Sequence, residues 1–145
     1  MFVTFITSFT IIFAGWASMI AHYSLPWEVF YPIKIYGNEK LASAVAVSPE
    51  SETKLQLDLI KQRIDERNEL ISDWYLSQEL DKQIMNQINY HSEILQEQLW
   101  KISERDLAQQ IESDLNSLLQ AVERQTSLLR EIFNKKDDQN TLVFQ

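Results

Sequence analysis

The sequence predicts an all-α protein with a single N-terminal transmembrane helix, a short irregular or hairpin connector, and a long helix of the coiled-coil type. Three observations lead to this fold class. Residues 1–25 contain no Asp, Glu, Lys or Arg, no Gly or Pro follows Pro49, and apolar residues recur at heptad spacing after it. We therefore expect a transmembrane anchor over 1–25, a connector over 26–48, a long helix over 49–135 and a tail over 136–145.

The predicted anchor is the apolar run that opens the chain. As a helix, the 24 residues from Phe2 to Leu25 would extend about 36 Å, enough to cross a hydrocarbon core of about 30 Å. A cleaved signal peptide is the alternative, and Gly15-Trp16-Ala17 would suit its cleavage site, but no Lys or Arg precedes the apolar run. Aromatic residues at its far end are expected to lie at the membrane interface, with lipid as a partner: Tyr23, Trp27, Phe30 and Tyr31.

Basic residues near the anchor indicate its orientation. Lys34 and Lys40 follow the apolar run, whereas no basic side chain precedes it. The positive-inside rule then favours a single-pass membrane protein with a cytoplasmic C-terminal region.

The connector differs in composition from the segments on either side. Pro26 and Pro32 disfavour a continuous helix, Val29–Tyr36 is β-branched and aromatic, and Gly37-Asn38 is typical of a turn. This pattern predicts an irregular segment or a small hairpin that needs a partner, because an isolated hairpin is marginally stable.

The long helix is predicted to begin at Ser48-Pro49, with Glu50 and Glu52 in its first turn. One heptad seam from Leu57 to Ile102 is apolar at ten of fourteen core positions, and a second from Ala108 to Ile132 at seven of eight. Together with Trp100, the seams supply the expected oligomer or partner interface: Leu57, Ile60, Ile64, Ile71, Trp74, Met85, Ile88, Leu95, Leu99, Ile102, Ile111, Leu115, Leu118, Val122, Leu129 and Ile132.

The two seams are half a turn out of phase, because nine residues separate Ile102 from Ile111. One interpretation is a break near 103–107, where Ser103 and Asp106 have capping-box spacing and a second helix would fold back. The other is a continuous rod that changes its partner face. We favour the continuous rod, because no Gly or Pro marks a turn there.

Polar residues interrupt both seams. They cost stability in an apolar interface, but such residues fix register and oligomer number in coiled coils. The interrupting residues are Arg67, Gln78, Asp81, Ser92 and Gln125.

The sequence offers no catalytic or metal-binding motif. There is no Cys, no Gly-rich phosphate loop and no H-E-x-x-H among its two histidines. His91 is interpreted as a structural or surface residue, although copies of it in a symmetric oligomer would respond to pH near 6. We therefore expect no enzyme activity, no cofactor and no metal.

The net charge of the chain limits the kinds of partner that are expected. The chain carries a formal net charge of −8, which disfavours nucleic acid because an acidic surface repels phosphate. The expected partners are lipid, the chain itself, and another subunit of a membrane complex.

The expected function is that of a non-enzymatic single-pass membrane subunit whose coiled coil mediates oligomerisation or assembly of a larger complex. Two alternatives stay open: an envelope-spanning tether or phage-lysis-type factor with an extracytoplasmic coil, and an accessory subunit of a membrane channel, pump or enzyme. The tail ends in Thr141–Gln145, a short apolar segment that would dock on a partner, fray, or be a protease-site remnant.

Overall fold

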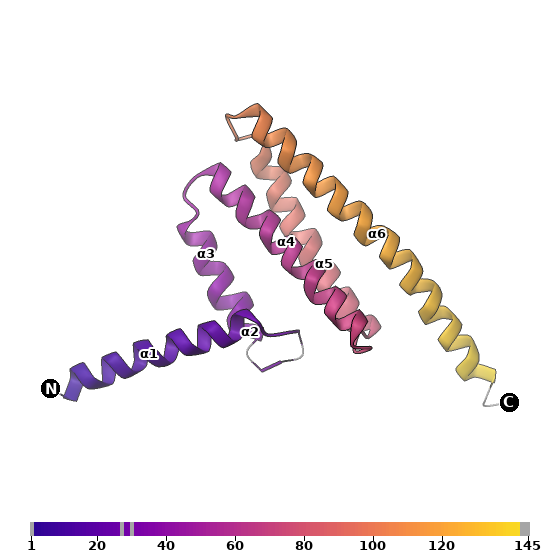
Figure 1. Cartoon of the computed structure of the whole chain (residues 1–145), viewed down its shortest axis with the longest axis horizontal. Coiled ribbons are helices and arrows are strands. Elements are labelled where there is room, and N and C mark those ends of the chain that lie inside the picture. The colour runs from indigo at the N-terminus through magenta and orange to yellow at the C-terminus, as the bar shows by residue number, and fades with distance from the viewer. Residues whose placement is uncertain (1, 27, 30, 143–145) are drawn as a thin grey trace. The chain divides into compact units, whose positions relative to one another are not determined.

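The computed structural model describes the backbone of residues 2–26, 28–29 and 31–142, and the side chains of residues 7, 10, 12–26, 28–29 and 31–133. The chain divides into two compact units, Met1–Ser48 and Pro49–Gln145. All regular elements in the described ranges are helices (Figure 1), as the all-α part of the prediction expects.

The first unit consists of two helical runs. One is α1 (Phe2–His22), and the other comprises α2 (Tyr31–Ile33), the π-helix η1 (Lys34–Glu39) and α3 (Lys40–Val45). Ser18 and Asn38 join the runs, because Ser18 Oγ donates to Asn38 Oδ1 at 2.6 Å and Asn38 Nδ2 donates to the Ser18 carbonyl at 2.9 Å. Lys34 is buried and donates to the Ser24 carbonyl at 3.2 Å.

The prediction of an irregular or hairpin connector is wrong. Pro32 lies in the first turn of a helix, where its missing N–H removes no helical hydrogen bond. Gly37 lies inside η1 rather than in a turn. The two turn-forming residues are thus accommodated within helical backbone.

The prediction of a transmembrane anchor over 1–25 is also contradicted. Across the residues that the structure describes, no helix combines the length and the apolarity needed to cross a membrane. The side chains of residues 1–6, 8, 9 and 11 lie outside the described set.

The predictions of single-pass membrane localisation and a cytoplasmic C-terminal region depended on that anchor and are corrected with it. Of the predicted membrane-interface residues, Tyr23 is 77% exposed at the end of α1 and Tyr31 begins α2. Trp27 and Phe30 lie outside the described residues.

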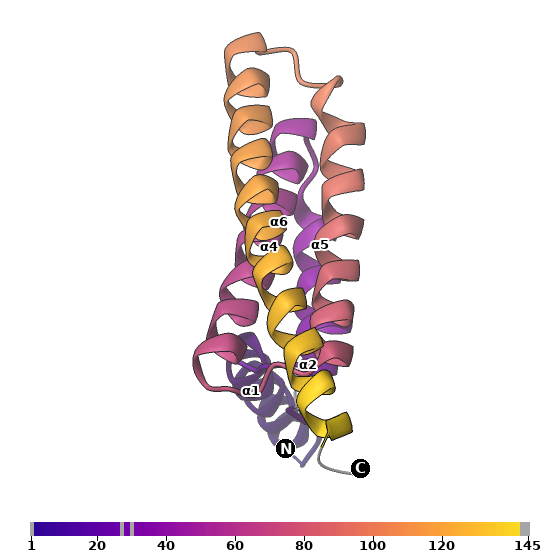
Figure 2. The same cartoon turned by 90° about the vertical axis from the view of Figure 1, so that its right-hand side faces the viewer.

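The second unit consists of three helices: α4 (Pro49–Ser72), α5 (Gln78–Leu99) and α6 (Arg105–Leu142). α4 and α5 form an antiparallel hairpin and pack closely along their lengths, while α6 runs back along both and makes fewer contacts (Figures 1 and 2). The continuous long helix over 49–135 is therefore wrong, because the chain leaves helical geometry between Ser72 and Gln78 and again between Leu99 and Arg105. The second interruption agrees with the alternative break near 103–107.

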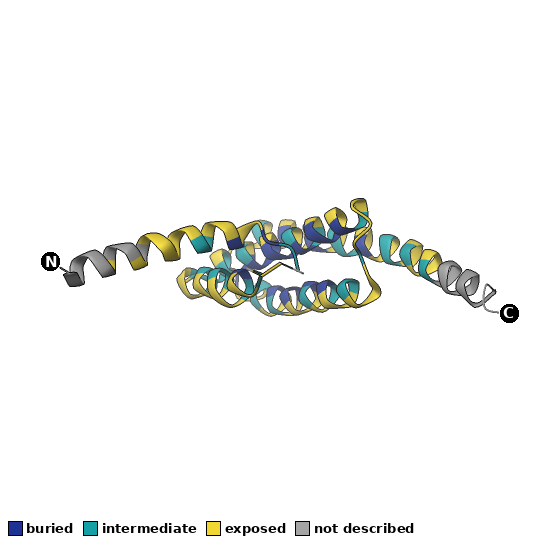
Figure 3. Cartoon of the chain, turned by 90° about the horizontal axis from the view of Figure 1, so that it is seen from below, coloured by how far each residue is buried: buried dark blue, intermediate teal, exposed yellow. Residues whose placement is uncertain are grey.

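The core of this unit is built from the two predicted seams. Figure 3 shows buried residues along the inner faces of the helices. The chain reverses direction between the two seams, and this reversal accounts for their half-turn difference in phase. The seam of α6 therefore faces the α4–α5 hairpin. The buried apolar cluster contains Leu57, Ile60, Leu70, Ile84, Ile88, Leu95, Ile102, Ile111, Leu115 and Val122.

One copy of the chain thus covers most of its own apolar seam. Burial of an aliphatic side chain contributes about 1.5–3 kcal/mol, so the contacts within this unit supply the stabilisation that the rod interpretation assigned to other chains. The predicted interface residues that belong to this cluster are therefore covered by other helices of the same chain.

Candidate functional site at the α4–α5 end of the bundle

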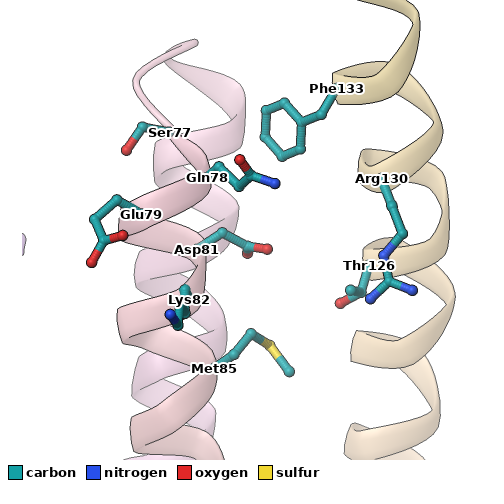
Figure 4. A pocket seen from close by; sticks show the side chains of 9 residues that line it. All are labelled: Ser77, Gln78, Glu79, Asp81, Lys82, Met85, Thr126, Arg130 and Phe133. Carbon is teal, nitrogen blue, oxygen red and sulfur yellow. The ribbon is translucent and has the colours of Figure 1, made fainter. Parts of the chain in front are cut away.

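An open cleft of about 800 Å³ lies between the N-terminal half of α5 and the C-terminal half of α6. Met85 and Phe133 supply apolar surface from opposite walls, and the Phe133 ring points across the cleft toward Gln78 (Figure 4). The remaining lining residues are polar or charged: Ser77, Glu79, Asp81, Lys82, Thr126 and Arg130.

A buried arginine beside this cleft ties the three helices together. Arg67 of α4 is 0% exposed. Its Nε donates to Asp81 Oδ1 at 2.7 Å, its Nη1 to Gln125 Oε1 at 3.3 Å, and its Nη2 to Thr126 Oγ1 at 2.9 Å. Asp81 lies on α5, and Gln125 and Thr126 lie on α6, so one guanidinium fixes how α4, α5 and α6 meet at this end. A buried guanidinium satisfied by one carboxylate and two neutral acceptors is stabilising only as a complete network.

The loop that joins α4 to α5 ends the first helix in a Schellman motif. The N–H of Tyr75 donates to the Leu70 carbonyl at 3.0 Å, and the N–H of Trp74 donates to the Ile71 carbonyl at 3.2 Å. Ser77 then caps α5, because its Oγ accepts from the N–H of Leu80 at 3.2 Å. These bonds satisfy helix-end groups that would otherwise lack helical partners.

The residue in the left-handed position of this motif is a tryptophan. Trp74 has φ 60°, where glycine is the usual residue and an L-residue costs about 1–2 kcal/mol. Its side chain is 92% exposed, and the neighbouring Tyr75 is 66% exposed. The indole therefore occupies a strained backbone position without contributing to the core of its own chain. Strain of this kind concentrates at functional sites.

A second polar cluster lies in the α4–α5 interface, around His91. Its Nδ1 lies 2.7 Å from Gln56 Oε1, and Gln56 Nε2 donates to Glu52 Oε1 at 2.7 Å. Because the Gln56 oxygen is thereby the acceptor, the neutral ring is protonated on Nδ1. Burial, and to a smaller extent the positive charge of Arg63, lower the pKa of His91 from 6.5 to about 4.

The low pKa of His91 predicts a specific loss of stability in acid. The unfolded chain takes up the proton near pH 6.5 and the folded chain only near pH 4, so stability is lost as the pH falls through this window. The loss amounts to about 3 kcal/mol at most. Urea unfolding of His91→Asn, whose amide can still donate to Gln56, is expected to show a shallower pH dependence than the unaltered chain between pH 6.5 and 4. Equal pH dependence of the two proteins would contradict the assignment.

The structure places the predicted interface residues in three environments. Most of them lie in the core cluster or pack against it, among them Leu57, Ile88 and Val122. Trp74, Trp100 and Ile132 are exposed, at 92%, 75% and 56%. Trp74 and Trp100 are thus exposed at the two loops, and Ile132 is exposed on α6, whereas most of the seam is used within the chain.

The cleft and the α4–α5 loop are features that the sequence analysis missed as a site. Ser77 followed by Glu79 and Asp81 is the signal that could have marked the start of α5, because a Ser N-cap and acids in the first turn favour a helix start. No comparable signal marks the cleft, since it depends on how far α5 and α6 diverge.

Within the described residues, no three His, Cys, Asp or Glu side chains lie close enough to hold a metal ion. A smaller cleft of about 590 Å³ in the first unit is lined by Ser18, His22, Tyr23 and Asn38 together with four apolar residues, and its lining contains no carboxylate or lysine. The cleft of the second unit combines two apolar side chains, Met85 and Phe133, with seven polar or charged ones.

No family model, no curated protein and no solved structure matches this chain.

Proposed function

We propose that this chain is a non-enzymatic protein-interaction module that assembles with another polypeptide. The contact is made at the end of the three-helix unit where the loop between α4 and α5 lies. The observation that carries the proposal is Trp74, a large aromatic residue in a left-handed conformation with 92% of its side chain exposed. Tryptophan and tyrosine are the residues that most often dominate binding energy at protein interfaces.

Three further features of the same end support the proposal. The Schellman turn fixes the backbone conformation at Trp74 before any partner binds. The loss of conformational entropy on association is therefore smaller. The Arg67 network fixes the neighbouring helices relative to each other. The adjacent cleft offers apolar walls together with charged groups that orient a bound chain.

Site-specific photo-crosslinking tests this function in cells that produce the full chain. A photoreactive phenylalanine analogue in place of Trp74 is expected to yield covalent adducts with a polypeptide. The same analogue in place of Tyr90 is the matched control, because Tyr90 is a 60% exposed aromatic residue on α5 away from the loop. Adducts at Trp74 no more abundant than those at Tyr90 would overturn the proposal.

A further inference from the structure

We propose that the polypeptide bound at this end is a second copy of the same chain, and that two copies exchange their Trp74–Tyr75 loops, each loop inserting into the α5–α6 cleft of the other. This inference rests on the proposed function and names its partner.

The projecting loop and the cleft lie next to each other on one unit. Trp74 precedes Gln78, the first residue of α5 and part of the cleft lining, by four positions. With 92% of its side chain exposed, Trp74 does not fill the cleft of its own chain. In the proposed dimer, the insertion of each loop into the cleft of the other copy is related to the reverse insertion by a two-fold axis. Such an interface closes at two copies.

The side chains that line the cleft suit the aromatic rings of the loop. Phe133 and Met85 offer the edge and sulfur contacts that aromatic rings favour, and Arg130 and Lys82 offer cations for the ring faces. A cleft of about 800 Å³ lies within the range of about 300–1,000 Å³ typical of binding pockets and can take one indole with part of a neighbouring ring.

The charges of the cleft lining and of the loop permit contact between two copies. The chain carries −8 overall, yet the cleft lining has two acids, Glu79 and Asp81, and two bases, Lys82 and Arg130. The local surfaces can therefore meet without net repulsion. Asp73, exposed beside Trp74, would bring a carboxylate toward the basic pair of the other copy.

The area available indicates a reversible dimer. A buried Trp or Tyr ring removes about 150–250 Å² from water, so two indoles, parts of two tyrosine rings and the matching cleft walls approach the lower end of the range of about 1,200–2,000 Å² found in specific interfaces. We expect a dissociation constant in the micromolar range, because the contact is at the small end of that range.

Sedimentation equilibrium of the full chain tests the inference. The apparent mass should rise from 17.1 kDa toward twice that value between about 1 and 100 µM protein. Trp74→Gly is expected to weaken dimerisation at least about tenfold. At low concentration, the same substitution should raise the folding equilibrium constant about fivefold, because glycine adopts the left-handed conformation without strain. A variant that is more stable but monomeric cannot owe its loss of dimer to misfolding.

Two further variants complete the design. Met85→Trp fills the cleft while leaving the loop intact, and it should also weaken dimerisation. Trp100→Ala removes a 75% exposed indole from the other loop of the bundle and should leave the dimer unchanged. A monomer at every concentration, or a dimer that neither Trp74→Gly nor Met85→Trp weakens, would overturn the inference. If crosslinks from Trp74 join only a different protein, the second-copy inference fails while the interaction function stands.

Discussion

Replacing Arg67 by alanine is expected to lower the free energy of unfolding of the Pro49–Gln145 unit by about 3–5 kcal/mol, because a fully buried side chain and its hydrogen bonds to both other helices are lost. The guanidinium is 0% exposed and holds acceptors on both other helices of the unit. Its loss leaves the carboxylate of Asp81 and the side chains of Gln125 and Thr126 without these donors, and it opens space beside the cleft. Urea titration of the full chain, followed by circular dichroism, measures the change.

A double-mutant cycle separates the network from simple loss of volume. Asp81→Leu alone should also be strongly destabilising, because it leaves Arg67 charged and buried. The pair Arg67→Met with Asp81→Leu should recover most of the lost stability, since a well-packed apolar pair often replaces a buried ion pair without cost. Additive losses in the double variant would contradict a coupled network.

The polar interruptions of the heptad seams were visible in the sequence, and three of them form this network. Arg67, Asp81 and Gln125 occupy core positions at which apolar residues were expected, and their proposed role was to fix register between chains. The structure joins them within one chain. Heptad position shows that a residue faces another helix, but it does not show whether that helix belongs to the same chain.

The chain reversals were harder to predict because neither contains glycine or proline. The α4–α5 turn is closed by Trp74 in a left-handed conformation, a position where glycine is the usual signal. The α5–α6 connection is formed by Trp100 and the residues that follow it, with Lys101 N–H bonded to the Gln98 carbonyl at 2.9 Å. The half-turn phase change between the seams was the better indicator of reversal there, and it outweighs the absence of Gly and Pro.

Trp74 and Met85 belong both to the predicted interface residues and to the loop and cleft of the candidate site. Trp74 was expected to be an interface residue because it occupies a core position of the first seam, whereas it is exposed on a loop beyond the end of α4. Gln78, Asp81 and Met85 of the cleft occupy seam positions, but no local pattern marks the cleft itself, because it results from the divergence of two helices. Periodicity predicted the faces of the helices but not the distances between them.

Replacing Leu95 by alanine is the second change with a large expected effect, and it tests the three-helix core directly. Leu95 is 0% exposed within the apolar cluster, so the substitution removes buried volume from a packed interior and should cost about 2–5 kcal/mol. Leu128→Ala on α6 is the matched control, because the same atoms are removed from a side chain that is 61% exposed, and its effect should stay within about 0.5 kcal/mol.

Concentration dependence distinguishes the bundle from a multi-chain coil. If Leu95 packs inside one chain, the cost of Leu95→Ala in the Trp74→Gly background should be the same over about two orders of magnitude of protein concentration. In a coil made of several chains, the midpoint of unfolding would rise with concentration, and the cost of the substitution would include weakened assembly. A constant midpoint together with a large difference between Leu95→Ala and Leu128→Ala requires that the seam be buried by the chain that carries it.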